Sequence, residues 1–226
     1  MAKVIITIDG PAASGKSTAA ALLAEKLGAT FLDTGAMYRA VTLAAMQENI
    51  DMTNQDKLLG VLDKNTIRLD TVENKMKVSI NNIDVTEQIR SASVTANAHY
   101  IASCVKLRER LVQMQRQFAA GCEKIVTEGR DQGTAVFPNA NIKFYLTATL
   151  SERARRRQAQ MKAQSGCLTI EQIQEDIEER DQRDKSRATG PLLQSDDAMV
   201  VDTTALSIEQ VVEKLCRLCE GKIVIG

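Results

Sequence analysis

A glycine-rich octapeptide near the start of the chain constrains the fold more than any other feature. Residues 10–17 read GPAASGKS and match the phosphate-binding pattern G-x-x-x-x-G-K-[ST]. The apolar run VIITI precedes the motif and the alanine-rich stretch TAAALL follows it, which is the strand-to-helix context that such a loop requires. In this context backbone N–H groups and the helix N-terminus face an anion, and a lysine adds positive charge. The motif predicts a site for the phosphates of a nucleoside triphosphate, built from Gly10, Pro11, Ala12, Ala13, Ser14, Gly15, Lys16, Ser17 and Thr18.

Short apolar segments recur between helical stretches along the rest of the chain. They lie at residues 4–8, 30–32, 124–127, 143–146 and 199–201. Strands that alternate with helices predict an α/β fold of three layers, with a five-stranded parallel sheet covered on both faces. Ligands bind beyond the carboxyl ends of such strands, and polar residues follow most of the predicted strands. The site should therefore lie at that edge of the sheet.

Two segments depart from this alternation. Residues 66–90 show period-2 patterning on both sides of Asn81 and Asn82, which favour a tight hairpin turn, so the segment predicts a small antiparallel insert. Residues 151–187 are highly charged and have a helical pattern that breaks at residues 165–166. The second segment predicts a pair of charged helices.

The composition excludes several classes of function. The 226 residues include 29 lysines and arginines and 29 aspartates and glutamates, so no net charge attracts nucleic acid or an anionic membrane. Three tyrosines, four phenylalanines and no tryptophan leave few rings to stack on bases. Apolar runs stay well short of the roughly 18 residues that span a bilayer, and the first strand follows no tripartite signal segment. We expect a cytoplasmic monomer that binds neither nucleic acid nor membrane.

The cysteines and the histidine give little support to metal or redox chemistry. Five cysteines, an odd number, argue against a disulfide framework and for a reducing compartment. Cys216 and Cys219 form a C-x-x-C pair without a second pair, in a segment patterned as an amphipathic helix, so we expect structural thiols. His99 is the single histidine and has no partner of its kind.

An acidic residue stands where a metal ion would be needed. Glu128 ends the apolar run IVT, the position at which nucleotide-binding sheets place a carboxylate that holds Mg²⁺ or its waters. A solvated carboxylate is the alternative. Asp9, which directly precedes the phosphate-binding motif, is a second candidate, and the Ser17 hydroxyl completes the predicted metal ligands.

Two arginine stripes lie in the predicted charged helices. Their spacings place each stripe on one helix face: Arg153, Arg156 and Arg157 in the first, and Arg180, Arg183, Asp184 and Arg187 in the second. Salt-bridged, solvated helices are the usual explanation of such runs. Beside a phosphate-binding loop, however, guanidinium groups on a closing segment can stabilise a phosphoryl group in transfer and exclude water. The stripes therefore favour an arginine-rich lid in a phosphotransferase.

Several sequence blocks resemble the signature motifs of bacterial cytidylate kinases. They are GPAASGKST at 10–18, DTGAMYR at 33–39, LRERL and QRQF within 107–118, EGRDQGTAVFP at 128–138 and ERDQRDKSR at 179–187. The resemblance extends nearly from end to end and implies a P-loop kinase that uses ATP and Mg²⁺ to phosphorylate CMP and dCMP. It also implies three regions: a core at 1–60, 104–150 and 192–226, a monophosphate-binding insert at about 61–103, and a lid at about 151–191.

The resemblance further implies roles for residues at the matching positions. The loop, with Mg²⁺ at Ser17 and Glu128, would hold the ATP phosphates beneath the lid residues Arg153, Arg156 and Arg157. Catalysis would depend on Lys16, Arg130, Arg157 and Arg187. The acceptor nucleotide would contact Thr34, Tyr38, Arg39, His99, Arg108, Arg130, Asp131, Arg180, Asp184 and Arg187.

The chemistry of cytosine agrees with two of these roles. A carboxylate such as Asp131 matches the exocyclic amine, and an arginine such as Arg108 matches the adjacent acceptors. Uracil would place a carbonyl against the carboxylate, and a buried group left unpaired disfavours the wrong base. The alternative is that Asp131 pairs with Arg130 or caps a helix.

The chain departs from the family pattern at two positions. His99 stands where a serine is common, and it is either a contact to the base or a packing residue. Ala13 stands where a second loop glycine is common, and we expect it to adopt a φ angle that alanine tolerates at little cost.

Other functions stay open on the sequence alone. A kinase of the same fold could act on UMP, AMP, dTMP or shikimate. A GTP-dependent switch has less support, because Asn74-Lys75 continues to Met76-Lys77 instead of N-K-x-D and because no D-x-x-G motif occurs.

Overall fold

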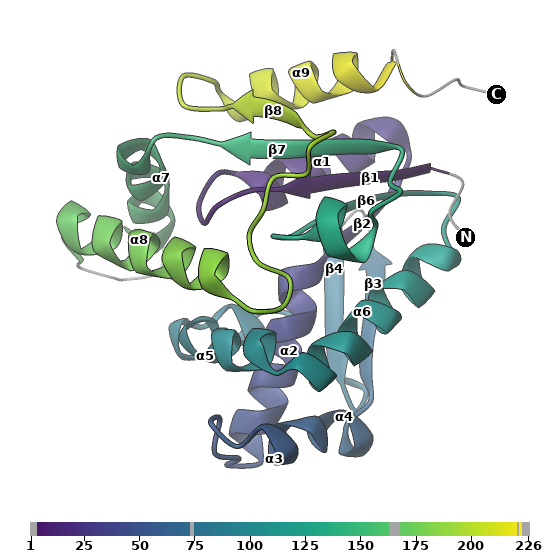
Figure 1. Cartoon of the computed structure of the whole chain (residues 1–226), viewed down its shortest axis with the longest axis vertical. Helices are drawn as coiled ribbons and strands as arrows, with labels where there is room; N and C mark the ends of the chain where they lie inside the picture. The colour runs from purple at the N-terminus through teal and green to yellow at the C-terminus, as the bar shows by residue number, and fades with distance from the viewer. Residues whose placement is uncertain (1–3, 73–74, 163–167, 221, 223–226) are drawn as a thin grey trace.

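The computed structural model describes residues 4–72, 75–162, 168–220 and 222, and in them one parallel sheet forms the centre of the molecule (Figure 1). The order of its five strands is β2-β6-β1-β7-β8. They are β1 (Val4–Asp9), β2 (Thr30–Asp33), β6 (Lys124–Glu128), β7 (Ile142–Thr147) and β8 (Met199–Asp202). All five predicted strands are confirmed, and each continues one residue further at its carboxyl end because the polar residue there still pairs with a neighbouring strand.

Helices cover both faces of the sheet and give the predicted three layers. Successive strand residues point to opposite faces, so Ile125 packs into one hydrophobic core and Val126 into the other. Helices α1 (Lys16–Leu27) and α9 (Ile208–Glu220) contribute to the core with Val126. Helices α2 (Thr34–Gln47) and α6 (Val105–Ala120) contribute to the core with Ile125. Each face of the sheet is thus buried, as a parallel sheet requires.

The antiparallel insert is confirmed beside α2 (Figure 1). Strands β3 (Ile67–Val72), β4 (Lys75–Ile80) and β5 (Ile83–Asp84) form its sheet, and α3 (Gln55–Leu59), α4 (Val61–Lys64), the short helix η1 (Gln88–Arg90) and α5 (Ala92–Ser103) flank it. Asn81 and Asn82 form the turn with φ angles of 51° and 68°. Asparagine tolerates this left-handed region better than most residues, which explains its use here.

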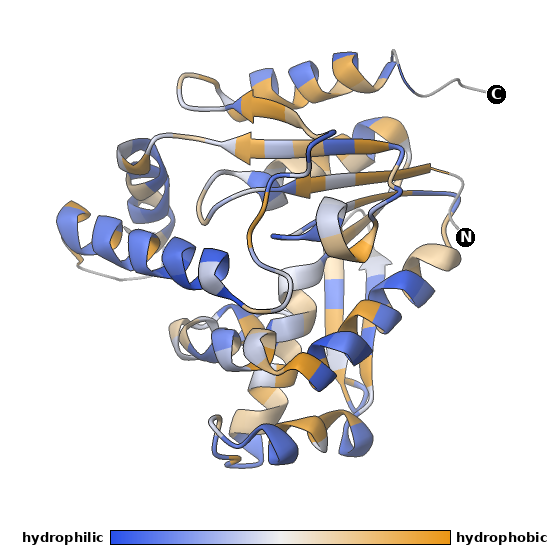
Figure 2. Ribbon diagram, in the orientation of Figure 1, coloured by the Kyte–Doolittle hydropathy of each residue, from blue (hydrophilic) through white to orange (hydrophobic). Residues whose placement is uncertain are grey.

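Two charged helices lie beyond the carboxyl ends of the strands: α7 (Leu150–Lys162) and α8 (Ile170–Ser186). Figure 2 shows that both are largely hydrophilic, unlike the strands of the sheet. The spacing of Thr169 and Gln172 predicts a capping box, and it is present at the start of α8. The predicted break at residues 165–166 lies outside the described residues. The short helix η2 (Gln132–Val136) follows β6 on the same edge of the sheet.

The thiols contribute to packing. Cys219 is buried in the core beneath α9, and burial raises its pKa to about 12, while the pKa of Cys216 is also raised by burial. Both are free thiols. Within the described residues no group of His, Cys, Asp and Glu side chains is arranged to hold a metal ion, and no helix has the length and apolarity needed to cross a membrane.

The hairpin turn generates a test of the insert's stability. Asn82→Gly should raise the free energy of unfolding by about 0.5–1 kcal/mol, because glycine adopts the positive φ without strain and the Asn82 side chain is exposed. Urea denaturation followed by circular dichroism measures the change. The matched control is Asn81→Gly, which also removes the hydrogen bonds of the Asn81 side chain to the Thr66 N–H (2.9 Å) and to Asn65 (2.9 Å) and should stabilise less. Equal gains from both substitutions would contradict the account of this turn.

Candidate active site

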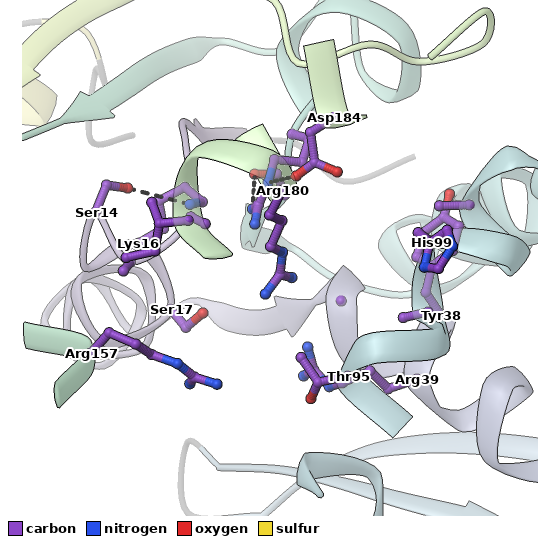
Figure 3. Close-up of a pocket in the computed structure, with 18 of the residues that line it drawn as sticks. Ser14, Lys16, Ser17, Tyr38, Arg39, Thr95, His99, Arg157, Arg180 and Asp184 are labelled. Carbon is purple, nitrogen blue, oxygen red and sulfur yellow. Dashed lines mark hydrogen bonds and ion pairs between the residues drawn. The ribbon is translucent and has the colours of Figure 1, made fainter. Parts of the chain in front are cut away.

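A cavity of about 570 Å³ lies where the carboxyl edge of the sheet meets the insert and the lid helices. Figure 3 shows the loop residues at one end of this cavity and Tyr38 and His99 at the other, with Arg180 pointing between them. Most residues singled out by the sequence line it: Ala12, Ala13, Ser14, Gly15, Lys16, Ser17, Thr18, Thr34, Tyr38, Arg39, His99, Arg108, Glu128, Arg130, Asp131, Arg157, Arg180, Asp184 and Arg187. The cavity lining does not include four of the predicted site residues, Gly10, Pro11, Arg153 and Arg156.

The phosphate-binding loop takes a conformation that requires left-handed residues. Gly15 has a φ of 88°, and Gly10 passes so close to the Leu146 backbone that a Cβ atom would overlap the Leu146 carbonyl. Ala13 has a φ of 58°, in the left-handed region, so the expectation of a φ angle that alanine tolerates at little cost is wrong. An L-residue in this region costs about 1–2 kcal/mol, because its Cβ atom approaches a carbonyl oxygen. The loop is therefore strained at Ala13.

Lys16 is the first residue of α1 and lies buried at the floor of the cavity. Its Nζ donates hydrogen bonds to the Pro11 carbonyl (2.6 Å) and to Ser14 Oγ (3.3 Å). Burial, and then the positive charge of Arg130, lower its pKa to about 7. A lysine held in this way gains strongly from an anion in the cavity, which would restore its charged form.

The predicted metal ligands lie together next to Lys16. Ser17 Oγ donates to Glu128 Oε1 at 2.6 Å, and the Thr34 hydroxyl donates to the Glu128 carbonyl at 2.8 Å. Burial and the nearby charge of Asp33 raise the pKa of the Glu128 carboxyl. A hydroxyl and a carboxylate beside phosphate positions are the oxygen ligands that Mg²⁺ prefers, so the donor set fits this metal.

Asp9 does not share that position. Its two carboxylate oxygens accept the backbone N–H groups of Gln132 (2.8 Å) and Gly133 (2.7 Å). Both oxygens hold the chain that follows Asp131, and Asp9 does not line the cavity, so its part in holding the metal stays an untested hypothesis. Its role is to join the end of β1 to that segment.

Arginines and carboxylates alternate across the middle of the cavity. Arg130 Nε and Arg187 Nη2 donate to the two oxygens of Asp184, at 2.8 and 2.7 Å, and Arg39 Nη2 donates to Asp33 at 2.9 Å. The Nε groups of Arg39 and Arg187 are buried and have no hydrogen-bond partner among the described residues. Buried donors left unpaired are costly, and an anion bound in the cavity would offer acceptors to these two.

Two further arginines of the predicted lid face the cavity. Arg157 and Arg180 both line it, and neither makes a hydrogen bond or ion pair within the described part of the chain. Burial and the charge of Arg130 lower the pKa of Arg180 to about 10. Figure 3 shows both side chains pointing into the cavity from the lid helices. They add positive charge where no protein carboxylate neutralises it directly.

The far end of the cavity holds a buried ion pair. Arg108 Nη2 donates to Asp131 Oδ2, and Arg108 Nη1 donates to the Tyr38 hydroxyl at 2.8 Å. Asp131 therefore pairs with Arg108, and the alternative pairing with Arg130 is not formed. Gly190 also belongs to this end of the cavity, because a Cβ atom there would overlap the Arg108 guanidinium. The sequence motifs do not single out Gly190 as a site residue, although the Gly-Pro dipeptide marks a turn at this position.

His99 lies on α5 at the same end of the cavity. Its Nδ1 lies 2.7 Å from the Ala96 carbonyl, and its ring centroid lies 4.0 Å from that of Tyr100. Because a carbonyl only accepts, Nδ1 carries the proton and the other ring nitrogen is an acceptor. His99 thus packs against Tyr100 and also lines the cavity. Its position therefore agrees with a packing role and leaves a contact to the base as a prediction.

The first arginine stripe divides between two tasks. Arg153 Nη1 donates to Asp181 Oδ2 (2.5 Å) and to the Ala12 carbonyl (3.0 Å), and Arg156 donates to the Thr203 carbonyl (2.6 Å). Only Arg157 of the three lines the cavity. The spacing predicts a shared helix face, and Arg153 and Arg156 on that face lie against the loop and the core; their contact with the nucleotide stays a prediction.

Comparisons with known proteins agree with this geometry. A family model described as cytidylate kinase matches residues 6–221. The chain is 42% identical to the cytidylate kinase of Bacillus subtilis (strain 168), over 97% of this chain and 98% of that protein. It is 44% identical to the cytidylate kinase of Listeria monocytogenes serovar 1/2a (strain ATCC BAA-679 / EGD-e), over 98% of both. The crystal structure of TT1252 from Thermus thermophilus shares the fold, with a TM-score of 0.50 and 17% identity over 99% of this chain and 100% of that one. The chain belongs to the cytidylate kinase family.

Proposed function

We propose that this chain transfers the γ-phosphoryl group of ATP to the phosphate of CMP and dCMP. One observation carries the proposal: a single cavity joins a phosphate-binding loop to a second set of buried, unpaired cationic donors, with the Arg108–Asp131 pair behind them. Two anion-binding regions in one cavity fit a donor and an acceptor that both carry phosphate. The family membership of the chain supports the same activity.

The loop end of the cavity would hold the donor. Backbone N–H groups of the loop and the N-terminus of α1 bind phosphate oxygens, while Lys16 adds a charge between the two substrates. Mg²⁺ would be held by Ser17 and Glu128, and when bound it neutralises charge on the ATP phosphates. Arg157, which lines the same region from α7, would contact the transferred group.

The middle of the cavity would hold the acceptor phosphate and sugar. Arg39 and Arg130 are the clamp for the monophosphate, and the unpaired Nε of Arg39 supplies a donor that needs an acceptor. Arg180, Asp184 and Arg187 would bind the sugar and its neighbouring groups from α8 and its carboxyl end. Thr34, at the start of α2, faces the acceptor region from the other side.

The far end of the cavity would recognise the base. Asp131 would accept a hydrogen bond from the cytosine amine, and Arg108 would donate to the ring acceptors. Part of the hydrogen bonding between Arg108 and Asp131 would then be replaced by hydrogen bonds to the base. Tyr38 holds Arg108 in position through its hydroxyl. The acceptor nitrogen of His99 is available to a donor at the same end.

This arrangement needs no nucleophilic side chain. The acceptor phosphate is itself an anionic nucleophile, so catalysis depends on alignment and on stabilising charge spread over the transferred oxygens. Lys16, Arg130, Arg157 and Arg187 line the same cavity, and Asp184 holds Arg130 and Arg187 in place before reaction, which suits them to that purpose. The lid helices over the cavity would exclude water as an alternative acceptor.

Truncation of the central cations should remove catalysis while the fold is kept. Lys16→Ala and Arg130→Ala should each lower kcat on the order of 10²-fold or more, as for the loss of one preorganised transition-state contact. Coupled ADP formation with CMP measures the rate. The matched control is Arg155→Ala on α7, whose side chain is 67% exposed and should matter little. A parental rate for Lys16→Ala would refute the mechanism.

Base selection should depend on the Asp131 carboxylate. Asp131→Asn keeps an oxygen near Arg108 but adds an amide donor that suits the uracil carbonyl. The ratio of kcat/KM for CMP to that for UMP should fall by at least about tenfold. The measurement is a panel of CMP, dCMP, UMP, AMP and dTMP with ATP and Mg²⁺. An unchanged ratio would mean that the base is recognised elsewhere.

Nucleotide binding should take up a proton above pH 7. Lys16 is already charged below its pKa of about 7, whereas above it the free protein holds a neutral amine that the anionic phosphates convert to the ammonium form. ATP affinity should therefore fall as pH rises from 7, by at most about tenfold per pH unit. Calorimetry at pH 8 in HEPES and Tris buffers detects the uptake through the buffer-dependent enthalpy. Lys16→Arg, which stays charged, should show none; equal uptake in both proteins would contradict the prediction.

A further inference from the structure

The backbone of one loop residue, Ala12, is held by the two lid helices. Asp181 on α8 accepts the Ala12 N–H at 2.8 Å through Oδ1, and Arg153 on α7 donates to the Ala12 carbonyl at 3.0 Å. Arg153 and Asp181 also bond each other at 2.5 Å, and both are buried. We call this closed set of contacts the Ala12 ring. It uses both polar groups of the Ala12 peptide backbone, so the position of this residue is determined from two helices at once.

Apolar contacts and a further anchor support the Ala12 ring. The Ala12 side chain packs with Ala154 of α7 and with Ile173 and Ile177 of α8 in a small hydrophobic cluster. Arg153 Nε donates to the Ala148 carbonyl at 3.2 Å, which ties the guanidinium to the segment between β7 and α7. The contacts of Ala12 with the lid are therefore polar and apolar, and all of them end if the helices move away.

The next residue explains why such support is needed. Ala13 has a φ of 58°, a conformation that alanine adopts only where its surroundings impose it. The Ala12 ring fixes the peptide directly before this strained residue. Without the ring, Ala13 can relax to an ordinary φ, which would turn the following loop N–H groups away from the phosphate position.

We propose that Asp181 and Arg153 are positioning residues that keep the phosphate-binding loop in its nucleotide-binding conformation while α7 and α8 are docked against it. The proposal rests on the proposed function, in which this loop holds ATP. Neither residue needs to touch the nucleotide. By linkage, bound ATP favours the docked lid by the same free energy with which the docked lid favours ATP. Undocking of the helices would weaken the hold on the spent nucleotide.

The first test is ATP affinity without an acceptor. Asp181→Asn places an amide donor against Arg153, and Arg153→Met removes the guanidinium; each should weaken Mg²⁺·ATP binding by about tenfold or more in calorimetry. Arg153→Lys, which keeps the charge, should lose less. Glu175→Gln removes an exposed carboxylate from the same helix and is the matched control. Melting temperatures identify the folded variants. If Asp181→Asn fails to fold, the ATP affinities of Arg153→Lys and Arg153→Met test the proposal instead.

The second test separates positioning of the loop from general stability. In an Ala13→Gly background the loop adopts the positive φ without strain, so Asp181→Asn should cost less than about threefold in ATP affinity there. The same substitution should lower the melting temperature equally in both backgrounds. Parental affinity in the folded variants, or the same loss of affinity in both backgrounds, would overturn the proposal. Failure of the parent chain to bind ATP would instead overturn the proposed function.

Discussion

The burial of several cations side by side in one cavity is the constraint on which the rest of the site depends. Burial together with the charge of Arg130 lowers the pKa of Lys16 to about 7 and that of Arg180 to about 10. Asp184 and Glu128 raise the pKa of Arg130, but they offset only part of the lowering at Lys16 and at Arg180. The ligand-free cavity is therefore a costly arrangement, and phosphate anions are the partners that relieve it.

The same constraint explains where the chain places its remaining carboxylates. Asp9 and Asp181 stand near the cations, yet their oxygens accept backbone N–H groups of the segment after Asp131 and of the phosphate-binding loop. Each carboxylate thus fixes a stretch of backbone, which is the start of η2 for Asp9 and the phosphate-binding loop for Asp181. Asp9 holds the acceptor side in place, and Asp181 holds the donor side. The two half-sites are therefore positioned relative to each other through the end of β1 and through α8.

Local patterns in the sequence predict the strands, the helices and the hairpin well. They predict poorly which group each side chain of the site contacts. The strands were predictable because buried parallel strands appear in the sequence as short apolar runs that end in polar residues. The hairpin was predictable because Asn81 and Asn82 favour a tight turn. The cavity residues follow from motifs whose chemistry is local. By contrast, helical spacing places Arg153 and Arg157 on one face but does not say that a loop carbonyl meets the first of them. The position of Ala13, where a loop glycine is common, hints at its positive φ, but no local signal shows that α7 and α8 hold the residue before it.

The lid helices connect the two ends of the cavity through different parts of their length. Near the loop, Asp181 of α8 bonds to Ala12. Beyond the carboxyl end of α8, Gly190 has a φ of 58° and lies directly against the Arg108–Asp131 pair, where a Cβ atom would overlap the guanidinium. A docked lid therefore completes the phosphate-binding loop and closes the base-recognition end together. In the proposed function such an arrangement would couple the donor end of the cavity to the base-recognition end, because α8 and the residues after it contact both.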